Sequence, residues 1–211
     1  MRRVTGRANA LLAPCVGVTT SPTVLGGRAG LTVAPKASRG TERAVLMFHG
    51  GGYVFGSPKM YRALAGRIAK ASSASVHLPS YRLAPEHPHP AAVEDGLAAY
   101  RALLEQVPAE QLAVGGDSAG GGLSVAVLQA AHREGLQMPA CLVLLSPWLD
   151  LTGDGASHVA NADTEILILP ASVGRATAWY LGEHDAADPA VSPLFGDLSG
   201  LPPTLVQVSG N

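Results

Sequence analysis

The chain has 211 residues, of which 47% are hydrophobic and 15% are charged, so it can bury one sizeable core and we expect a single domain over residues 1–211. Its 15 Lys and Arg residues are balanced by 16 Asp and Glu residues. The net charge of −1 lacks the basic excess typical of proteins that bind nucleic acids, so we expect no nucleic-acid partner. No apolar run approaches the roughly 18 residues of a membrane-spanning helix, and we expect no membrane span.

The first 40 residues are the least informative part of the sequence. A weakly apolar stretch at 8–18 follows two arginines and contains Cys15, which gives a weak likeness to a secretory signal and to a lipidation site. An asparagine and a proline interrupt both patterns. We interpret residues 1–40 as an N-terminal arm or cap remnant with the first strand. The two cysteines, Cys15 and Cys141, are too few for a disulfide framework, and we expect a cytoplasmic protein.

From residue 43 onward, short β-rich apolar runs alternate with amphipathic stretches of helical period. The run at 44–48 is continuously apolar and ends in glycines, as expected of a buried central strand. This alternation predicts an α/β protein with a doubly wound, mostly parallel sheet and helices on both faces. The expected strands are 44–48, 74–78, 111–114, 141–145 and 204–208, and the expected helices begin near Pro58, Pro90 and Ala119.

Residues 149–200 interrupt this alternation of strand and helix patterns. Gly, Asp and Pro residues are scattered through them, and the pattern predicts one helix at 172–181 that ends at Gly182. We interpret this segment as a lid-like excursion from the domain.

The strongest motif is the sequence GDSAG at residues 116–120, which lies between an expected strand and an expected helix. A G-x-S-x-G sequence in this position is typical of a nucleophile elbow, because the glycines allow a tight turn that projects the serine above the sheet at a helix N-terminus. Ser118 is therefore the candidate nucleophile. A plain Gly/Ser turn or a phosphate-binding loop is the alternative.

A second motif, HGGG, follows the expected strand at 44–48. Consecutive glycines expose backbone N–H groups, and a tetrahedral oxyanion needs such donors. We predict an oxyanion hole formed by the amides of Gly51, Gly52 and Ala119, the residue after the nucleophile. His49 and Gly50 are expected to support this loop rather than to react.

Four segments in order, HGGGYVFGS (49–57), YRLAPEHPHPA (81–91), GDSAGGGLS (116–124) and LLSPWLDL (144–151), resemble the hormone-sensitive-lipase-like branch of the α/β-hydrolase carboxylesterases. The resemblance covers roughly residues 30–210. It implies a serine esterase that hydrolyses small acyl esters, with Ser118 as the nucleophile. It implies no cofactor, and we expect no metal site at His87 and His89.

In this family the triad acid and histidine follow the nucleophile in that order. The resemblance places both beyond Asn211, so we expect this chain to be an incomplete form that lacks the C-terminal strand and helix of the fold. The histidines after Ser118 are His132, His158 and His184, and none lies in the family's histidine motif. We expect none of them to act as the base, and the resemblance implies that Asp150 is a site-shaping or structural residue.

Three functions remain open at this point. The first is a carboxylesterase with a small-molecule ester substrate. The second is a non-catalytic small-molecule binder, since gibberellin receptors resemble this family and lack the catalytic histidine. The third is an inactive fragment. The sequence leaves the oligomeric state open and is compatible with a homo-oligomer.

Overall fold

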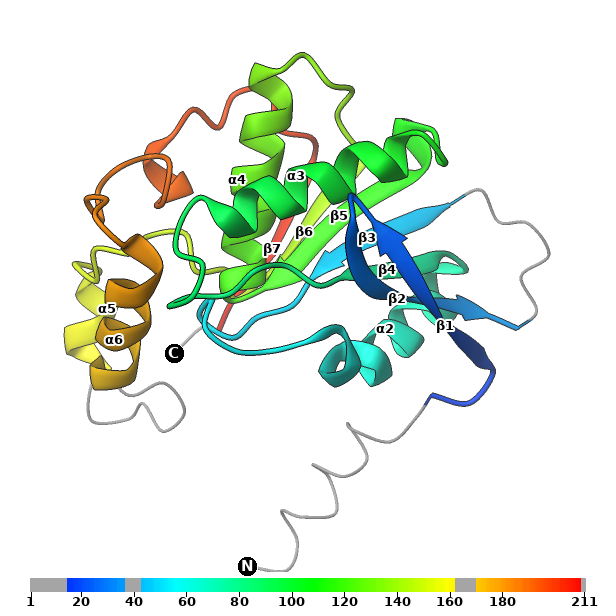
Figure 1. The fold of residues 1–211 in the computed structure, drawn as a ribbon, viewed down its shortest axis with the longest axis horizontal. Coiled ribbons are helices and arrows are strands. Elements are labelled where there is room, and N and C mark those ends of the chain that lie inside the picture. Colours follow the sequence, from blue (N-terminus) through cyan, green and yellow to red (C-terminus); the bar gives the residue numbers. More distant parts are fainter. Residues whose placement is uncertain (1–14, 37–42, 162–169, 210–211) are drawn as a thin grey trace, which may run out of the picture.

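The computed structural model describes residues 15–36, 43–161 and 170–209. Their centre is a seven-stranded sheet with the order β1-β2-β4-β3-β5-β6-β7 (Figure 1). Neighbouring strands from β4 to β7 run parallel, whereas β2 pairs antiparallel with both β1 and β4. The strands are β1 (Val18–Leu25), β2 (Arg28–Pro35), β3 (Ala44–Phe48), β4 (Ser75–Pro79), β5 (Leu112–Asp117), β6 (Cys141–Leu145) and β7 (Thr204–Gln207).

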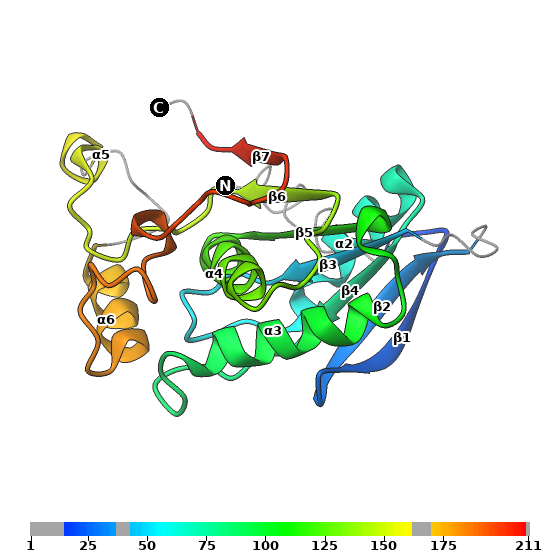
Figure 2. The ribbon, with the colours of Figure 1, turned by 90° about the horizontal axis from the view of Figure 1, so that it is seen from above.

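Helices cover both faces of this sheet, as Figure 2 shows. α2 (Pro58–Ser72) packs on one face against β2 and β4, and α3 (Ala91–Leu104) and α4 (Ala119–Arg133) pack together on the other face. Side chains of β3 alternate between two cores, since Leu46 and Phe48 join the α3/α4 side and Met47 joins the α2 side. The predicted doubly wound, mostly parallel α/β fold is confirmed.

Among the described residues before residue 40, the structure has two strands, where the sequence pattern predicted one. β1 and β2 form an antiparallel hairpin whose turn residues, Gly26 and Gly27, both have positive φ values of 56° and 79°. Two successive residues with positive φ are what a two-residue hairpin turn requires, and glycine adopts that conformation at little cost. In the sequence, the Gly26–Gly27 pair therefore indicates a hairpin turn. Residues 1–14 and 37–40 of the predicted arm lie outside the described residues.

The segment 149–200 contains α5 (Ala156–Ala160), α6 (Pro170–Leu181) and the 3-10 turn η2 (Pro193–Phe195). α5 and α6 lie beyond the carboxyl ends of the parallel strands (Figure 1). The segment contributes buried side chains to the main core, among them Tyr180 and Val191. It is therefore packed against the domain on which the predicted site lies.

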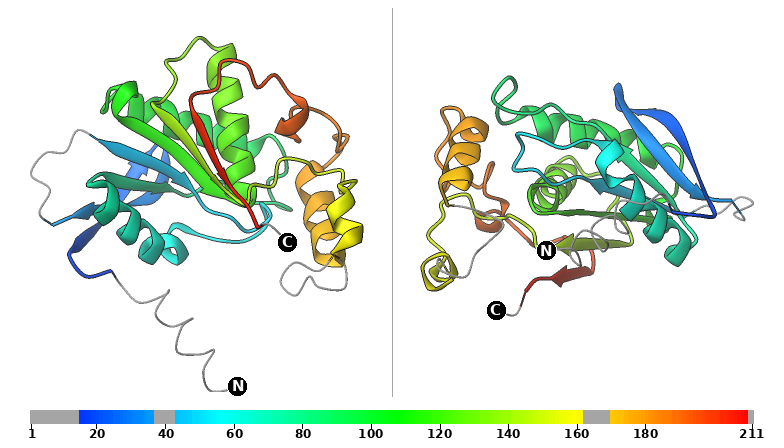
Figure 3. Two further views of the ribbon diagram at one scale, coloured as in Figure 1. Left: turned by 180° about the vertical axis from the view of Figure 1, so that it is seen from behind. Right: turned by 90° about the horizontal axis from the view of Figure 1, so that it is seen from below.

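β7 forms one edge of the sheet, and α2 lies on the side opposite α4 (Figure 3). All four residues of β7 are exposed, including Leu205 at 62%. Within the described ranges, none of the helices combines the length and the apolar character needed to cross a bilayer.

Candidate functional site

The serine turn, residues 116–120, joins the end of β5 to the start of α4. Ser118 has φ 51° and ψ −123°, a strained conformation for a residue with a side chain, and α4 begins at the next residue. The Ser118 N–H donates to the Leu145 carbonyl of β6 at 3.0 Å, and its carbonyl accepts from Trp148 at 2.9 Å. The strained turn is thus held by the neighbouring strand and the segment that follows it.

Close backbone packing also fixes the serine turn. A Cβ on Gly120 would lie 2.2 Å from the Phe48 carbonyl oxygen and 2.6 Å from that of His49. Real Cβ atoms do not approach other atoms so closely, so only glycine allows α4 to lie this near the end of β3. The serine turn and the loop after β3 are therefore in direct contact.

That loop is the predicted HGGG motif, residues 49–52, which we call the glycine loop. Its Gly50 N–H donates both to the Tyr61 hydroxyl at 2.8 Å and to Asp117 Oδ1 at 3.0 Å. Tyr61 in turn donates to Asp117 Oδ2 at 2.7 Å. Since Asp117 immediately precedes Ser118, these bonds join the glycine loop to the serine turn.

His49 occupies a buried position at the base of the glycine loop. Its side chain is 2% exposed, and its Nδ1 lies 2.8 Å from the Gly50 carbonyl oxygen, to which it donates as Nδ1–H. Burial lowers the pKa of His49, although the Gly50 bond and the charge of Asp117 oppose this shift. The Tyr81 ring stacks on the imidazole at 4.3 Å, and its hydroxyl donates to the His49 carbonyl at 2.7 Å.

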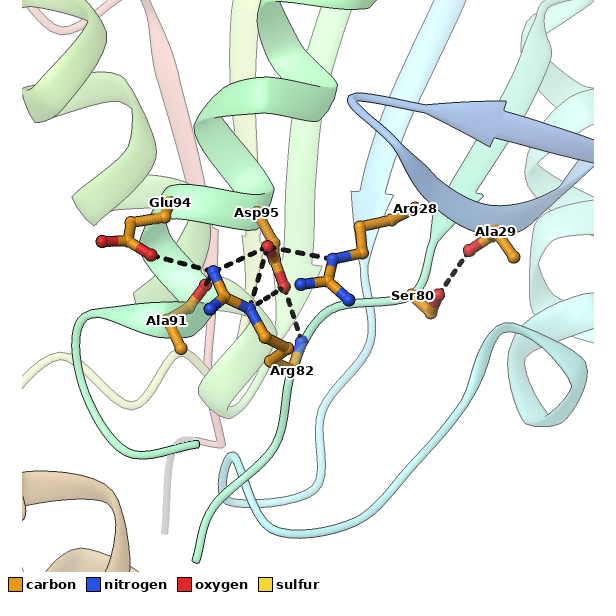
Figure 4. Close-up of polar contacts among 7 residues, drawn as sticks. All are labelled: Arg28, Ala29, Ser80, Arg82, Ala91, Glu94 and Asp95. Carbon is orange, nitrogen blue, oxygen red and sulfur yellow. Dashed lines mark hydrogen bonds and ion pairs between the residues drawn. The ribbon is translucent and has the colours of Figure 1, made fainter. Parts of the chain in front are cut away.

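An ion-pair network holds the segment that carries Tyr81 (Figure 4). Arg82 donates to the Asp95 carboxylate through its side chain at 2.9 to 3.1 Å and through its backbone N–H at 2.9 Å. Arg28, from the start of β2, reaches the same carboxylate at 3.0 Å, and Glu94 pairs with Arg82 at 2.8 Å. Burial alone would raise the pKa of Asp95, but the bonds from the two arginines lower it overall.

The predicted oxyanion donors differ from Gly50 in their hydrogen bonding. In the part of the chain that the structure describes, the amides of Gly51, Gly52 and Ala119 donate to no protein acceptor, whereas the Gly50 amide has two. The Ala119 amide is also the first of α4, where the helix dipole favours negative charge. These three N–H groups can therefore serve a bound anion or oxygen.

Comparison with known proteins agrees with this arrangement. A family model described as alpha/beta hydrolase fold matches residues 45–211. The chain belongs to this alpha/beta hydrolase family.

Relatives of this hydrolase chain include proteins named acetyl-hydrolase and esterase. It is 47% identical over 174 residues to an acetyl-hydrolase from Streptomyces hygroscopicus, a match covering 82% of this chain and 58% of the relative. It is 39% identical over 173 residues to the putative acetyl-hydrolase LipR of Mycobacterium tuberculosis, covering 81% of this chain and 56% of the relative. The chain thus spans less than two thirds of the length of these relatives.

Solved structures give the same result. The hormone-sensitive lipase homologue EstE7, from a metagenome library, has a TM-score of 0.89 at 43% identity, over 96% of this chain and 71% of that one. An esterase from the bacterial hormone-sensitive lipase family has a TM-score of 0.91 at 40% identity, over 99% of this chain and 70% of that one. The predicted membership of the hormone-sensitive-lipase-like branch is confirmed.

Among the described side chains, no histidine that follows Ser118 is hydrogen-bonded to the Ser118 hydroxyl. His132 lies 14 residues after Ser118 along α4, about 21 Å away at 1.5 Å per residue. His184 follows α6 and faces His89 and Asp188, and the side chain of His158 lies outside the described part. Asp150 accepts bonds from the Thr152 N–H and hydroxyl, which fits the predicted structural role.

Three residues that hold the glycine loop were not predicted from the sequence. Asp117 lies inside the GDSAG motif and Tyr61 lies in the helix expected to begin near Pro58, but neither was assigned a contact. Tyr81 lies in the YRLAPE segment, 32 residues from its partner His49. A tyrosine on the buried face of a helix needs a polar partner for its hydroxyl. This requirement could have indicated a hydrogen bond for Tyr61.

Proposed function

We propose that this protein is a serine carboxylesterase that hydrolyses small acyl esters through an acyl-enzyme intermediate, with Ser118 as the nucleophile. The observation that carries the proposal is the position of Ser118 at a strained turn, half-buried at the start of α4 and joined through Asp117 to a loop with unused N–H groups. The esterase names of relatives up to 47% identical support the same reaction class.

In the proposed reaction, the Ser118 hydroxyl loses its proton to a general base while Oγ bonds to the ester carbonyl carbon. The carbonyl oxygen becomes an oxyanion. The tetrahedral intermediate then collapses, the carbon–oxygen bond to the alcohol breaks, and the alcohol leaves with the proton. Water attacks the acyl-enzyme by the same route and releases the carboxylic acid and free Ser118.

The amides of Gly51, Gly52 and Ala119 stabilise the oxyanion in this proposal. A preorganised donor acts most strongly where charge develops in the transition state, and loss of one such donor costs about 10² to 10³ in kcat. His49 and Gly50 support the loop, since the His49 Nδ1–H holds the Gly50 carbonyl and the Gly50 N–H is held by Tyr61 and Asp117. Each of these contacts restricts the loop to one conformation.

The base in this proposal is a histidine in the part of the family domain that the relatives have and this chain does not span. No histidine side chain in the described ranges is hydrogen-bonded to the Ser118 hydroxyl, and His49 already uses its Nδ1 on Gly50. The order of the family's triad, in which acid and histidine follow the nucleophile, agrees with this assignment.

The remaining expectations follow from the proposed chemistry. Ester hydrolysis by this route needs neither a metal nor a cofactor. Residues 149–200 act as a lid that lines the substrate pocket, since α6 packs against the glycine loop. The substrate is a small-molecule ester, the protein has no nucleic-acid partner and functions in the cytoplasm, and a homo-oligomer is compatible with the proposal.

The test is hydrolysis of p-nitrophenyl acetate and butyrate by the full-length protein, together with labelling of the serine by a fluorophosphonate. We expect turnover, and we expect Ser118→Ala to lower kcat by about 10⁶ and to abolish labelling. Ser72→Ala is the matched control, because Ser72 is exposed at the end of α2 and bonds only locally to Ile68. It should retain full activity.

Two other outcomes would overturn the proposal. Labelling and turnover that survive Ser118→Ala would show that another residue is the nucleophile. Binding of an ester without turnover or labelling would favour the alternative, a non-catalytic small-molecule binder.

A further inference from the structure

Helix α6 lies directly against the glycine loop and the residue that follows it. The Tyr180 ring stacks on the Tyr53 ring with centroids 3.8 Å apart and planes 8° from parallel, and each residue is 1% exposed. One turn earlier in α6, the Ala176 methyl group is 3.3 Å from where a Cβ on Gly52 would lie. Residues 52 and 53 thus rest on one face of α6.

His89 holds α6 in this position from the other side. Its backbone N–H donates to the Tyr180 carbonyl at 2.8 Å, and its Nδ1 lies 3.3 Å from the Tyr180 hydroxyl. The imidazole meets the Tyr180 ring edge-on, with centroids 5.7 Å apart. Tyr180 is therefore packed between Tyr53 and His89.

A second histidine makes this junction sensitive to charge. The His184 ring lies 4.8 Å from the His89 ring in an edge-to-face arrangement, and its Nδ1 is 3.8 Å from Asp188. The groups that act on His89 are His184 and Asp188 from the segment after α6, Glu94 from α3 and the Tyr180 hydroxyl from α6. Two imidazolium rings this close would repel each other, and the carboxylates of Asp188 and Glu94, whose side chains are 41% and 59% exposed, offset that charge only through water.

The neutral form of His89 is favoured in the docked structure. Burial and, to a smaller extent, the charge of His184 lower its pKa to about 4 against the opposing charges of Asp188 and Glu94. A free imidazole has an ordinary pKa of 6.5. Proton uptake therefore accompanies undocking between pH 6.5 and 4, and the docked state loses stability as the pH falls through that window.

We propose that Tyr180 is a positioning residue for the glycine loop, acting through Tyr53, and that the His89–His184 pair releases α6 from the loop in acid. The consequence for catalysis rests on the proposed function, because it assumes that the loop binds the oxyanion. The coupling between α6 and the loop is a property of the fold and can be measured without any substrate.

The test is amide hydrogen exchange of the purified protein between pH 7.5 and 4.5, expressed as protection factors to remove the intrinsic pH dependence. We expect protection at 50–56 and at 172–181 to fall together, by at least fivefold, while α4 stays protected. In Tyr180→Leu, residues 50–56 should already be deprotected at pH 7.5. Tyr180→Phe keeps the ring stack and should rescue that protection.

Three variants separate the histidine pair from general acid sensitivity. His89→Phe keeps the edge contact and the backbone bond to Tyr180 but cannot be protonated. In this variant, protection at 50–56 and 172–181 should therefore not change with pH. His184→Gln should reduce the pH dependence. His87→Gln is the matched control, because His87 is exposed on the same segment, and it should behave as the wild type.

Equal pH dependence in His89→Phe and the wild type would overturn the acid release. Unchanged exchange at 50–56 in Tyr180→Leu would overturn the coupling. Failure of the proposed function gives a different pattern, in which exchange behaves as expected but no ester is hydrolysed. If Tyr180→Leu does not fold, the pH series on the wild type and His89→Phe still decides the question.

Discussion

The serine turn after β5 and the glycine loop after β3 lie in contact, but different interactions hold them. The serine turn is fixed by the backbone, because Gly120 lies against the carbonyl oxygens at the end of β3. The glycine loop has a close backbone approach within itself, since a Cβ on Gly51 would lie 2.1 Å from the Phe55 carbonyl oxygen. Side chains tie it to the rest of the domain, namely Tyr61 of α2, Asp117 of β5 and Tyr81 of the segment after β4. Loss of one side chain should loosen the loop, whereas a single added methyl group should disrupt the turn.

The largest effect is expected for Gly120→Ala. The new Cβ would lie 2.2 Å from a backbone carbonyl oxygen, and backbone atoms of a central strand cannot move away as a flexible side chain can. We expect a loss of about 3 kcal/mol or more in the free energy of unfolding, measured by urea denaturation. A loss of less than about 1 kcal/mol in the free energy of unfolding would show that the serine turn can relax around the added methyl group. It would contradict the proposed difference from the glycine loop.

The next effect concerns Asp95, which anchors the segment that carries Tyr81. Asp95 is 6% exposed and pairs with Arg28 and Arg82, so Asp95→Asn leaves two arginines without their shared carboxylate. Both arginines keep partial access to water, and we expect a loss of about 2 to 3 kcal/mol at pH 7. Glu94→Gln is the matched control, because the Glu94 side chain is 59% exposed, and it should cost less than about 0.5 kcal/mol.

The same pair of proteins gives a pH test. The folded-state pKa of Asp95 is lowered from its ordinary value of 3.8, so its contribution to stability is present above that value and is lost as the pH falls through the folded-state pKa. The difference between wild type and Asp95→Asn should be constant from pH 5 to 7 and should shrink below pH 3.8. A difference that grows in acid would contradict the ion-pair assignment.

Tyr61→Phe should have a smaller effect that falls on catalysis. The Gly50 N–H keeps its bond to Asp117 at 3.0 Å, so the glycine loop loses one of its two acceptors rather than its anchor. One net hydrogen bond is worth about 1 kcal/mol, and we expect kcat of the full-length enzyme to fall about five- to tenfold with KM within twofold. Tyr100→Phe makes the same change at a hydroxyl bonded to the Gln137 carbonyl, away from the loop, and should leave kcat unchanged.

The difference between the serine turn and the glycine loop also explains which features could be predicted from the sequence. Constraints on the backbone leave a pattern in the neighbouring sequence. The glycines around Ser118 predicted the turn, and apolar runs such as that of β3 predicted the central strands and their helices. The hairpin of β1 and β2 was missed although Gly26 and Gly27 mark its turn. β1 carries a proline and its side chains are mostly exposed, so it lacks the apolar run that identified the central strands.

Side-chain constraints are set by partners far along the chain and leave little local trace. Tyr61 and Asp117 are 56 residues apart, and His89 and Tyr180 are 91 residues apart. Their contacts depend on the strand order, in which β3 lies between β4 and β5, and on the packing of α6 against the residues that follow β3. Motifs therefore predicted which residues could react, and the structure was needed to identify what holds them.

The smallest effect, and one of opposite sign, is expected for Gly174→Ala in α6. No atom of the described residues lies within 4 Å of the added Cβ, Gly174 is exposed, and its φ is not in the left-handed region. Alanine in a helix is favoured over glycine by about 0.5 to 1 kcal/mol, so the variant should be slightly more stable in urea. The same Gly-to-Ala change thus destabilises the serine turn and stabilises α6, because only the first glycine is in contact with a backbone. A loss of stability in Gly174→Ala would show that α6 is constrained on its outer face as well as where Tyr180 and Ala176 meet the loop.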